Sequence, residues 1–334
     1  MDPPVHVLLV HLGPAKPKYL KDCVEQIRLW NPDPERVIIW LITEDIHTTD
    51  PFFTDLSIRL VSVSSLQTTH RHKEFKEVNV KDLSFGQGYW TFVKERFYFL
   101  EELILRENLT NCVHMEYDVM IYGDLPSICK RLSETGENRI RYGLDNPFRG
   151  HPGWMYIPSI PSYTALTEFF TYLEVSKKSM TDIEAMAVFW ANFPQFVRPL
   201  PFVPEKLQRE DRCSPSGQVR VKTSEFLHTD AKAIGCIFDS AVMGHHFAGI
   251  DPRNTGGVKI SSYQNESALY TADELQLDWS KEKGLWKPYA LGTVPVFTIH
   301  VHSKALLCLR SDRFDRPKAD WDINEVYPNL LPYN

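Results

Sequence analysis

Two short apolar runs near the start of the chain constrain its fold more than any other feature. Residues 5–10 and 37–42 are almost wholly apolar, and the second run lacks the alternation of a half-exposed strand, which is typical of a strand buried on both faces of a parallel sheet. Between them, Leu20, Val24 and Ile27 recur at helical spacing, and an Asn-Pro pair ends the helix. This order of strand, loop, helix and strand predicts the opening of a nucleotide-binding α/β unit.

The rest of the chain continues this alternation of strands and helices. Further strands are expected at 58–63, 112–117, 153–157 and 296–303, and further helices at 91–106, 163–175 and 182–190. We therefore predict an α/β fold whose mainly parallel central sheet is flanked by helices and binds ligands at the carboxyl ends of its strands. The polar stretches expected to form loops are 66–88, 204–222 and 251–288.

Composition argues against several classes of protein. The 334 residues include 37 basic and 43 acidic ones, without the basic excess of a nucleic-acid-binding protein. The basic cluster at 70–73 is expected in a solvated loop. The six cysteines form no C-x-x-C pair, so buried thiols are expected. Apolar runs are shorter than the ~18 to 20 residues of a membrane span, and no signal-peptide pattern opens the chain, so a cytoplasmic location without nucleic-acid partners is expected.

Glu116 and Asp118 form the first group of residues that can carry chemistry. Positions i and i+2 of an extended segment face the same side, so both carboxylates are expected together at the end of a buried strand. Such a pair must protonate, find basic partners or bind a metal. Hard ions such as Mg²⁺ and Mn²⁺ take carboxylate oxygens and keep positions for phosphate oxygens. The alternative is a pair of acids that cap loop amides.

A second group is predicted on the last strand, where His300, His302 and Lys304 would share one face. An imidazole can complete a carboxylate-bound Mn²⁺ site, and a lysine ammonium can neutralise a diphosphate. A structural role with hydroxyl or backbone partners is the alternative for the two histidines.

Three further residues stand in suggestive places. Asp182 follows Thr181 at an expected helix start, where a helix cap or a catalytic group fits. Asp239 lies among small residues that leave space for a ligand, although a cap fits equally well. Arg96, on the helix before the acidic strand, can reach a phosphate or a carboxylate, or remain solvated.

In this order the motifs resemble the GT-A-type glycosyltransferases, which combine a Rossmann-like sheet, a D-x-D or E-x-D motif and a metal-bound nucleotide sugar. Residues 7–13 resemble the first nucleotide strand and loop, residues 88–96 the helix that leads into the motif strand, and residues 116–118 the metal motif. The resemblance extends over residues 5–306. The chain departs from the pattern in its first motif acid, which is Glu, and in lacking the glycogenin-like H-x-x-G-x-x-K-P-W ending.

The resemblance implies Mn²⁺ or Mg²⁺ as cofactor, a nucleoside diphosphate sugar as donor, with a UDP-sugar favoured, and a glycan or glycosylated acceptor. The residues that it implies are Glu116, Asp118, His302 and alternatively His300 for the metal; His11, Gly13, Arg96 and Lys304 for the donor; and Asp239 and Asp182 for catalysis. The reaction expected is transfer of a hexosyl or pentosyl group to an acceptor hydroxyl. The chain would be one domain, 1–334, with a nucleotide-sugar half at 1–126, an acceptor half at 127–310 and a tail at 311–334.

Two other functions fit parts of the sequence. A sugar nucleotidyltransferase shares the sheet and the metal, but residues 11–16 are a poor version of its triphosphate loop. A non-catalytic glycan- or nucleotide-binding module would keep the GT-A-like fold without turnover. Under either the transferase or the binding-module hypothesis, exposed aromatic side chains would stack on sugars, and the candidates are Trp154, Tyr156 and Trp286.

Overall fold

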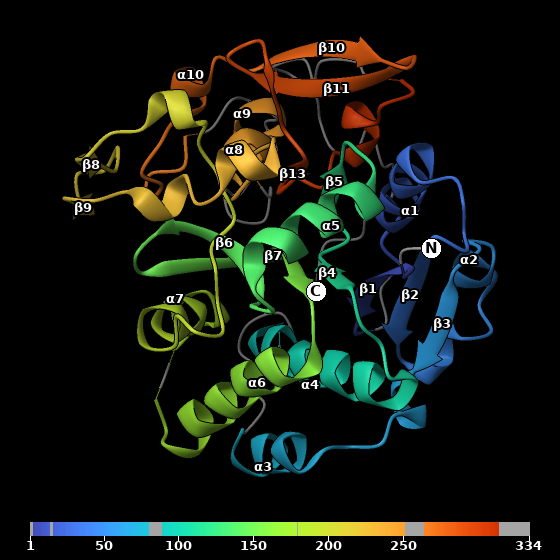
Figure 1. Ribbon diagram of the computed structural model, residues 1–334. Helices are drawn as coiled ribbons and strands as arrows, with labels where there is room; N and C mark the ends of the chain where they lie inside the picture. The colour runs from blue at the N-terminus through green and yellow to red at the C-terminus, as the bar shows by residue number, and fades with distance from the viewer. Residues whose placement is uncertain (1–2, 14–15, 80–88, 179, 251–263, 314–334) are drawn as a thin grey trace.

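The computed structural model describes residues 3–13, 16–79, 89–178, 180–250 and 264–313. Its centre is a six-stranded sheet with the order β3-β2-β1-β4-β7-β6 (Figure 1). Five strands point the same way, and β7 runs antiparallel to both of its neighbours. The bounds are β1 Val5–His11, β2 Val37–Thr43, β3 Arg59–Ser62, β4 Cys112–Met115, β6 Arg141–Asn146 and β7 Arg149–Ile157. The predicted α/β fold with a mainly parallel sheet is confirmed.

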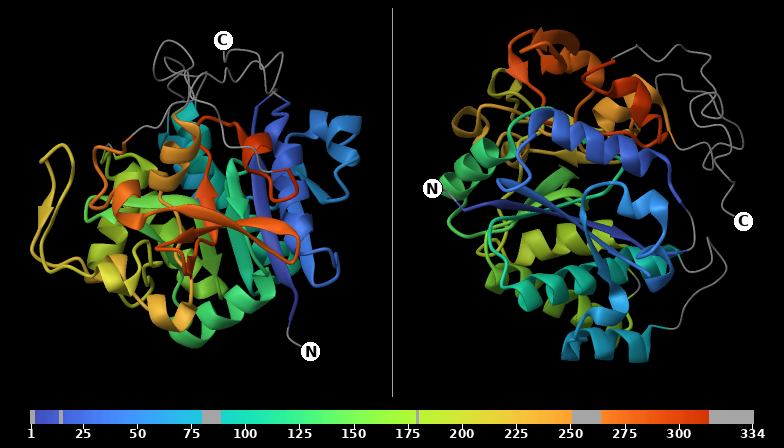
Figure 2. Two further views of the ribbon diagram at one scale, coloured as in Figure 1. Left: turned by 90° about the horizontal axis from the view of Figure 1, so that it is seen from above. Right: turned by 90° about the vertical axis from the view of Figure 1, so that its right-hand side faces the viewer.

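Helices cover both faces of this sheet. Helices α1 and α5 lie on one face, and α3, α4 and α6 lie on the other (Figure 2). As the spacing predicts, α1 buries Leu20, Val24 and Ile27 and ends just before Asn31, its C-cap. The bounds are α1 Tyr19–Trp30, α2 Pro51–Thr54, α3 His70–Val78, α4 Tyr89–Glu107, α5 Leu125–Gly136, α6 Ile160–Val175, α7 Asp182–Asn192, α8 Ala231–Ile234, α9 Val242–Ala248 and α10 Ala272–Leu275.

Three small antiparallel sheets complete the described structure. They are β5 Val119–Ile121 with β13 Thr298–His300; β10 Asp278–Glu282 with β11 Leu285–Ala290 and β12 Val294–Pro295; and β8 Arg212–Cys213 with β9 Arg220–Val221. The strand expected at 296–303 is therefore shorter than predicted. The loop expected at 251–288 is wrong where the structure describes it, because α10, β10 and part of β11 form there. Trp279 anchors this region, since its buried ring packs against Tyr122 with ring centroids 5.3 Å apart.

Helix α3 corrects the prediction that residues 66–88 form a loop and that the basic cluster 70–73 is solvated. Thr69 caps the helix by accepting a hydrogen bond from the His72 amide. His72 is fully buried, with Nδ1 2.7 Å from Glu102 and Nε2 3.2 Å from Glu95, and its ring stacks on Tyr98. These partners come from α4, so a polar sequence becomes a packed helix through contacts that no local pattern reveals. Residues 80–88, with both glycines of this stretch, lie outside the described residues.

The cysteines agree with the prediction. All six are free thiols, and five of them are buried. Among the described helices, none combines the length and the apolar character that a membrane crossing requires. Most of the predicted tail, 311–334, lies outside the described residues, which end at Arg313.

We predict that docking of α3 depends on the charge of His72. Burial alone would lower the pKa of His72, but hydrogen bonds to Glu102 and Glu95 outweigh it and raise this pKa above 6.5. A raised pKa in the folded state stabilises the protein below pH 6.5, and this stability is lost as the pH rises through the folded-state pKa. Between pH 6.5 and 8 the free energy of unfolding should therefore fall by on the order of 1 kcal/mol more in wild type than in His72→Gln.

Chemical denaturation at a series of pH values measures this difference. His70→Gln is the matched control, because His70 lies on the same helix with an exposed side chain. If the free energy of unfolding of His72→Gln depends on pH as that of wild type does, His72 is not the group responsible.

Candidate metal centre

The acid pair stands where the chain leaves the carboxyl edge of the sheet. Strand β4 ends at Met115, and the next residues turn, with the Val119 amide donating to the Glu116 carbonyl at 3.0 Å. The Glu116 amide donates to the Gly153 carbonyl of β7 at 2.9 Å. Glu116 and Asp118 are thus held by backbone contacts at the edge where α/β sheets bind ligands.

Strand β13 brings His300 to these acids. It pairs antiparallel with β5, so that His300 lies opposite Val119, and the Val301 amide donates to the Asp118 carbonyl at 2.8 Å. His300 Nε2 is 3.1 Å from Asp118 Oδ2 and 3.5 Å from Glu116 Oε2. One donor atom from each of the three residues lies within 4.8 Å of the others.

Each acid also has a cationic partner. Arg96 from α4 contacts Glu116 and donates to Asp182 at 2.9 Å, and Lys304 contacts Asp118. Burial would raise the pKa of Glu116, but Arg96 outweighs it and lowers this pKa to about 2. Burial acts likewise on Asp118, yet Lys304 and His300 hold its pKa well below 3.8. Both acids are therefore ionised at neutral pH.

Asp118 carries the feature that fits a metal ion. Its Oδ1 atom is buried and has no hydrogen-bond partner among the described residues. A buried carboxylate oxygen without a partner is unfavourable, and a cation would satisfy it. Two carboxylates suit Mn²⁺ or Mg²⁺ and leave coordination positions for phosphate oxygens, and the imidazole can complete the site for Mn²⁺. Glu116, Asp118 and His300 are the residues that can hold such an ion.

The two other predicted acids already have partners. Asp182 is buried at the first position of α7, beside a Thr181–Glu184 capping box, and pairs with Arg96. Burial raises the pKa of Asp182, and Arg96 opposes this rise. These contacts are those of a structural ion pair.

Asp239 caps the start of α9. Its two oxygens accept hydrogen bonds, each 2.9 Å long, from the amides of Met243, Gly244 and His300. Burial raises its pKa, and these amides oppose the rise. The space that its small neighbours suggested for a ligand is filled: a Cβ on Gly244 would lie 1.7 Å from the His300 carbonyl oxygen. Asp239 and Gly244 thereby fix the backbone of the candidate metal ligand.

His302, the second histidine predicted on the last strand, lies beyond the end of that strand. Strand β13 ends at His300, so His302 stands in the following turn, and the predicted shared face with His300 and Lys304 is wrong. The His302 ring contacts His245, with centroids 5.1 Å apart, and its centroid is 6.0 Å from that of His300.

The predicted donor-binding residues of the first strand lie near the acid pair. His11 ends β1, and its Nδ1 is 3.2 Å from the hydroxyl of Tyr117, the residue between the two acids. Gly13 has a φ of +100°, which glycine adopts readily, and its carbonyl accepts a hydrogen bond of 2.8 Å from His47.

His151 is a site residue that the sequence analysis missed. Its Nε2 lies 3.2 Å from His300 Nδ1, on the side of the imidazole away from the acids. Burial lowers the pKa of His151 to about 3, so the ring is neutral. The sequence around His151 gives little indication of a site, because this Gly- and Pro-containing stretch does not have the pattern of a strand, although it forms part of β7.

Two of the predicted sugar-stacking aromatics are buried. Trp154 packs against Phe238 and Phe297, and Tyr156 is 2% exposed. Both lie on β7 inside the fold, so the prediction that they are exposed is wrong. Trp286 is partly exposed, with Lys281 over its ring.

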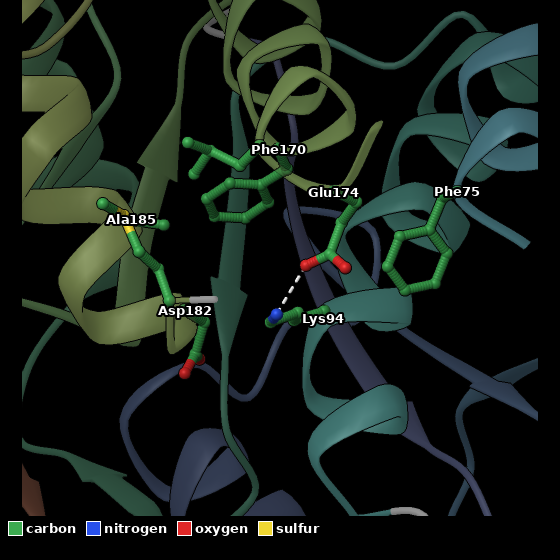
Figure 3. A pocket seen from close by; sticks show the side chains of 8 residues that line it. Phe75, Lys94, Phe170, Glu174, Asp182 and Ala185 are labelled. Carbon is green, nitrogen blue, oxygen red and sulfur yellow. Dashed lines mark hydrogen bonds and ion pairs between the residues drawn. The ribbon is translucent and has the colours of Figure 1, made fainter. Parts of the chain in front are cut away.

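A small pocket lies beside Asp182 between α3, α4, α6 and α7 (Figure 3). Its lining is mainly apolar, and Lys94 pairs with Glu174 at 2.5 Å. Figure 3 shows the Asp182 carboxylate turned away from this pair. The pocket therefore belongs to the packing between helices.

No protein-family model matches the chain, and no curated protein matches its sequence. Several of the solved structures that the chain resembles are glycosyltransferases, and two others, with TM-scores of 0.32 and 0.31, are cytidylyltransferases. The galactosyltransferase LgtC, in complex with donor and acceptor sugar analogs, has a TM-score of 0.40 and 11% identity over 59% of this chain and 73% of its own. Mouse xyloside xylosyltransferase 1 has a TM-score of 0.39 and 12% identity, over 59% of this chain and 84% of its own. The glycosyltransferase GlyE of Streptococcus pneumoniae has a TM-score of 0.38 and 11% identity, over 60% of this chain and 45% of its own.

We predict that Arg96 is required for the stability of the site. Arg96→Met leaves Glu116 and the buried Asp182 without their cation and should lower the free energy of unfolding by about 3 kcal/mol. Adding Asp182→Asn should recover part of this loss. Denaturant unfolding measures both effects. Arg106→Met, on the exposed end of the same helix, serves as the control, and equal stability of the two single variants would refute the prediction.

Proposed function

We propose that this protein is a metal-dependent glycosyltransferase that moves a sugar from a nucleoside diphosphate sugar to an acceptor hydroxyl. The observation that carries the proposal is the buried Oδ1 of Asp118, which has no hydrogen-bond partner in the part of the chain that the structure describes and lies beside Glu116 and His300 at the carboxyl edge of the sheet. This edge is where an α/β fold receives a nucleotide. The resemblance of the E-x-D motif to GT-A-type enzymes supports the same reaction.

The residues divide into three roles under this proposal. Glu116, Asp118 and His300 hold Mn²⁺ or Mg²⁺, which when bound neutralises charge on the diphosphate leaving group. Lys304 supplies a second cation for the diphosphate. Arg96 fixes the orientation of Glu116 through its contact with that carboxylate.

The donor and acceptor sides are proposed from the positions of the remaining residues. His11 and Gly13, at the end of β1, would contact the donor, with UDP as the favoured nucleotide. The division into a nucleotide-sugar half, 1–126, and an acceptor half, 127–310, remains a proposal. For Asp239 and Asp182 the contacts favour positioning roles over proton transfer, because amide donors or Arg96 already occupy their oxygens.

A second candidate function is a non-catalytic glycan- or nucleotide-binding module. The ion pairs of Arg96 with Glu116 and of Lys304 with Asp118 favour it, because they neutralise the acids without a metal. Such a module would bind a nucleotide sugar without releasing a nucleoside diphosphate, whereas a transferase releases it in step with transfer.

Asp118→Asn tests the transferase directly. The amide keeps the shape of the side chain but removes the charge that holds the metal, so Mn²⁺-dependent turnover of the cognate donor should fall at least about 100-fold. A thermal-shift panel of nucleoside diphosphate sugars with and without Mn²⁺ identifies the donor, and release of the nucleoside diphosphate measures turnover.

The matched control is Asp124→Asn. Asp124 caps α5 by accepting from the Ser127 amide, and asparagine caps helices equally well. Full activity in Asp118→Asn would sink the proposal, and binding without turnover in wild type would favour the module.

The histidine that completes the metal centre can be identified by comparing two variants. His300→Ala removes a side chain whose Nε2 faces both acids, and it should weaken Mn²⁺ binding at least about tenfold. His302→Ala should change this affinity less than about threefold, because the His302 ring contacts His245. Calorimetric titration with Mn²⁺ measures both, and the opposite ranking would return the assignment to His302.

A further inference from the structure

The role proposed for Lys304 at the diphosphate does not explain why this lysine contacts Asp118 in the structure. Its ammonium contacts Asp118 Oδ2, the oxygen that His300 Nε2 approaches to 3.1 Å. The other oxygen of the same carboxylate, Oδ1, is buried without a partner among the described residues. An ammonium on one oxygen and a divalent ion on the other would place two cations on a single carboxylate.

The backbone around Lys304 is shaped to produce this contact. Lys304 has a φ of +69°, in the left-handed region that few residues other than glycine adopt. Its amide donates to the Val301 carbonyl at 2.8 Å, and the Val301 amide donates to the Asp118 carbonyl at 2.8 Å. The turn that contains Lys304 is thus hydrogen-bonded to Asp118 and directs the lysine side chain toward that residue. Backbone strain of this kind persists only where the surroundings enforce it.

Electrostatics favours a different partner for Lys304 once a metal is present. A divalent ion beside Asp118 repels the ammonium, and the repulsion is strong because Lys304 is 16% and Asp118 8% exposed. A diphosphate brings more negative charge than the carboxylate and binds a lysine ammonium well. The lysine side chain is long and flexible enough to change partners without a change of the backbone.

We infer that Lys304 is an internal counter-ion that holds Asp118 in the metal-free protein and moves to the diphosphate when the donor binds. Metal and donor binding are then coupled, because each favours the release of Lys304 from Asp118. By linkage the donor tightens the metal by the same factor as the metal tightens the donor. This inference rests on the proposed function and describes how its metal centre is loaded.

The first experiment measures Mn²⁺ binding to the full chain without nucleotide, by the electron paramagnetic resonance signal of free Mn²⁺. Lys304→Asn should bind Mn²⁺ at least about tenfold more tightly than wild type, because Asp118 loses its competing cation. Asparagine suits the left-handed backbone. Lys304→Gly, which also suits that backbone, is the second variant in case the first folds poorly, and thermal unfolding checks both.

Lys94→Asn is the matched control. Lys94 forms a similar half-buried pair with Glu174, with a side chain 19% exposed against 16% for Lys304, and lines the pocket between helices (Figure 3). The substitution Lys94→Asn removes the same charge as Lys304→Asn and should leave the affinity for Mn²⁺ within about twofold of wild type.

The second experiment uses UDP as the probe at saturating Mn²⁺. Lys304→Asn should bind UDP more weakly than wild type, and UDP should tighten Mn²⁺ by a smaller factor in the variant. Mn²⁺ affinity equal to or below that of wild type in both Lys304 variants overturns the counter-ion role while the proposed function stands. Absence of Mn²⁺ binding by wild type, with and without UDP, overturns the metal dependence itself.

Discussion

The repulsion between Glu116 and Asp118 is the constraint on which the rest of the site depends. Two carboxylates at the end of a buried strand are unfavourable unless cations compensate them. The fold supplies this compensation from distant parts of the chain: Arg96 from α4, and His300 and Lys304 from the end of β13. The helix layer beneath the sheet and the last strand are therefore joined through one pair of acids.

Backbone contacts, more than side chains, set the position of the candidate metal ligands. The Val301 amide fastens the end of β13 to Asp118, and the Asp239 carboxylate accepts from the amide of His300. Gly244 permits the start of α9 to touch the His300 carbonyl. A buried carboxylate that binds three amides is more useful as a rigid support than as a base, and this explains why a cap lies so close to the site.

Patterns within the sequence predicted the parts of the structure that local physics determines. Unbroken apolar runs and helical spacing predicted five of the six strands of the central sheet and helices α1, α4, α6 and α7, but neither β6 nor α5. Glu116 and Asp118 do lie together, but in a turn after β4 and not on the extended segment that the i, i+2 spacing assumed. The choice between His300 and His302 depended on where β13 ends, which is set by pairing with β5 across about 180 residues of chain. Helix α3 was missed for the same reason, since His72 is buried by glutamates of α4.

Under the proposed function, charge balance lets one site accept both a metal and a diphosphate. Glu116, Asp118 and Asp182 bring three negative charges, while Arg96 and Lys304 bring two positive ones. Burial would lower the pKa of His300, but Asp118 and Glu116 outweigh it and raise this pKa above 6.5. With the neutral imidazole that a metal ligand requires, one negative charge remains uncompensated, and this favours a cation. A divalent ion reverses the sign to one net positive charge, which favours an anionic ligand. Under the proposed function, this reversal favours binding of the diphosphate once the metal is present, in keeping with the proposed coupling between the two ligands.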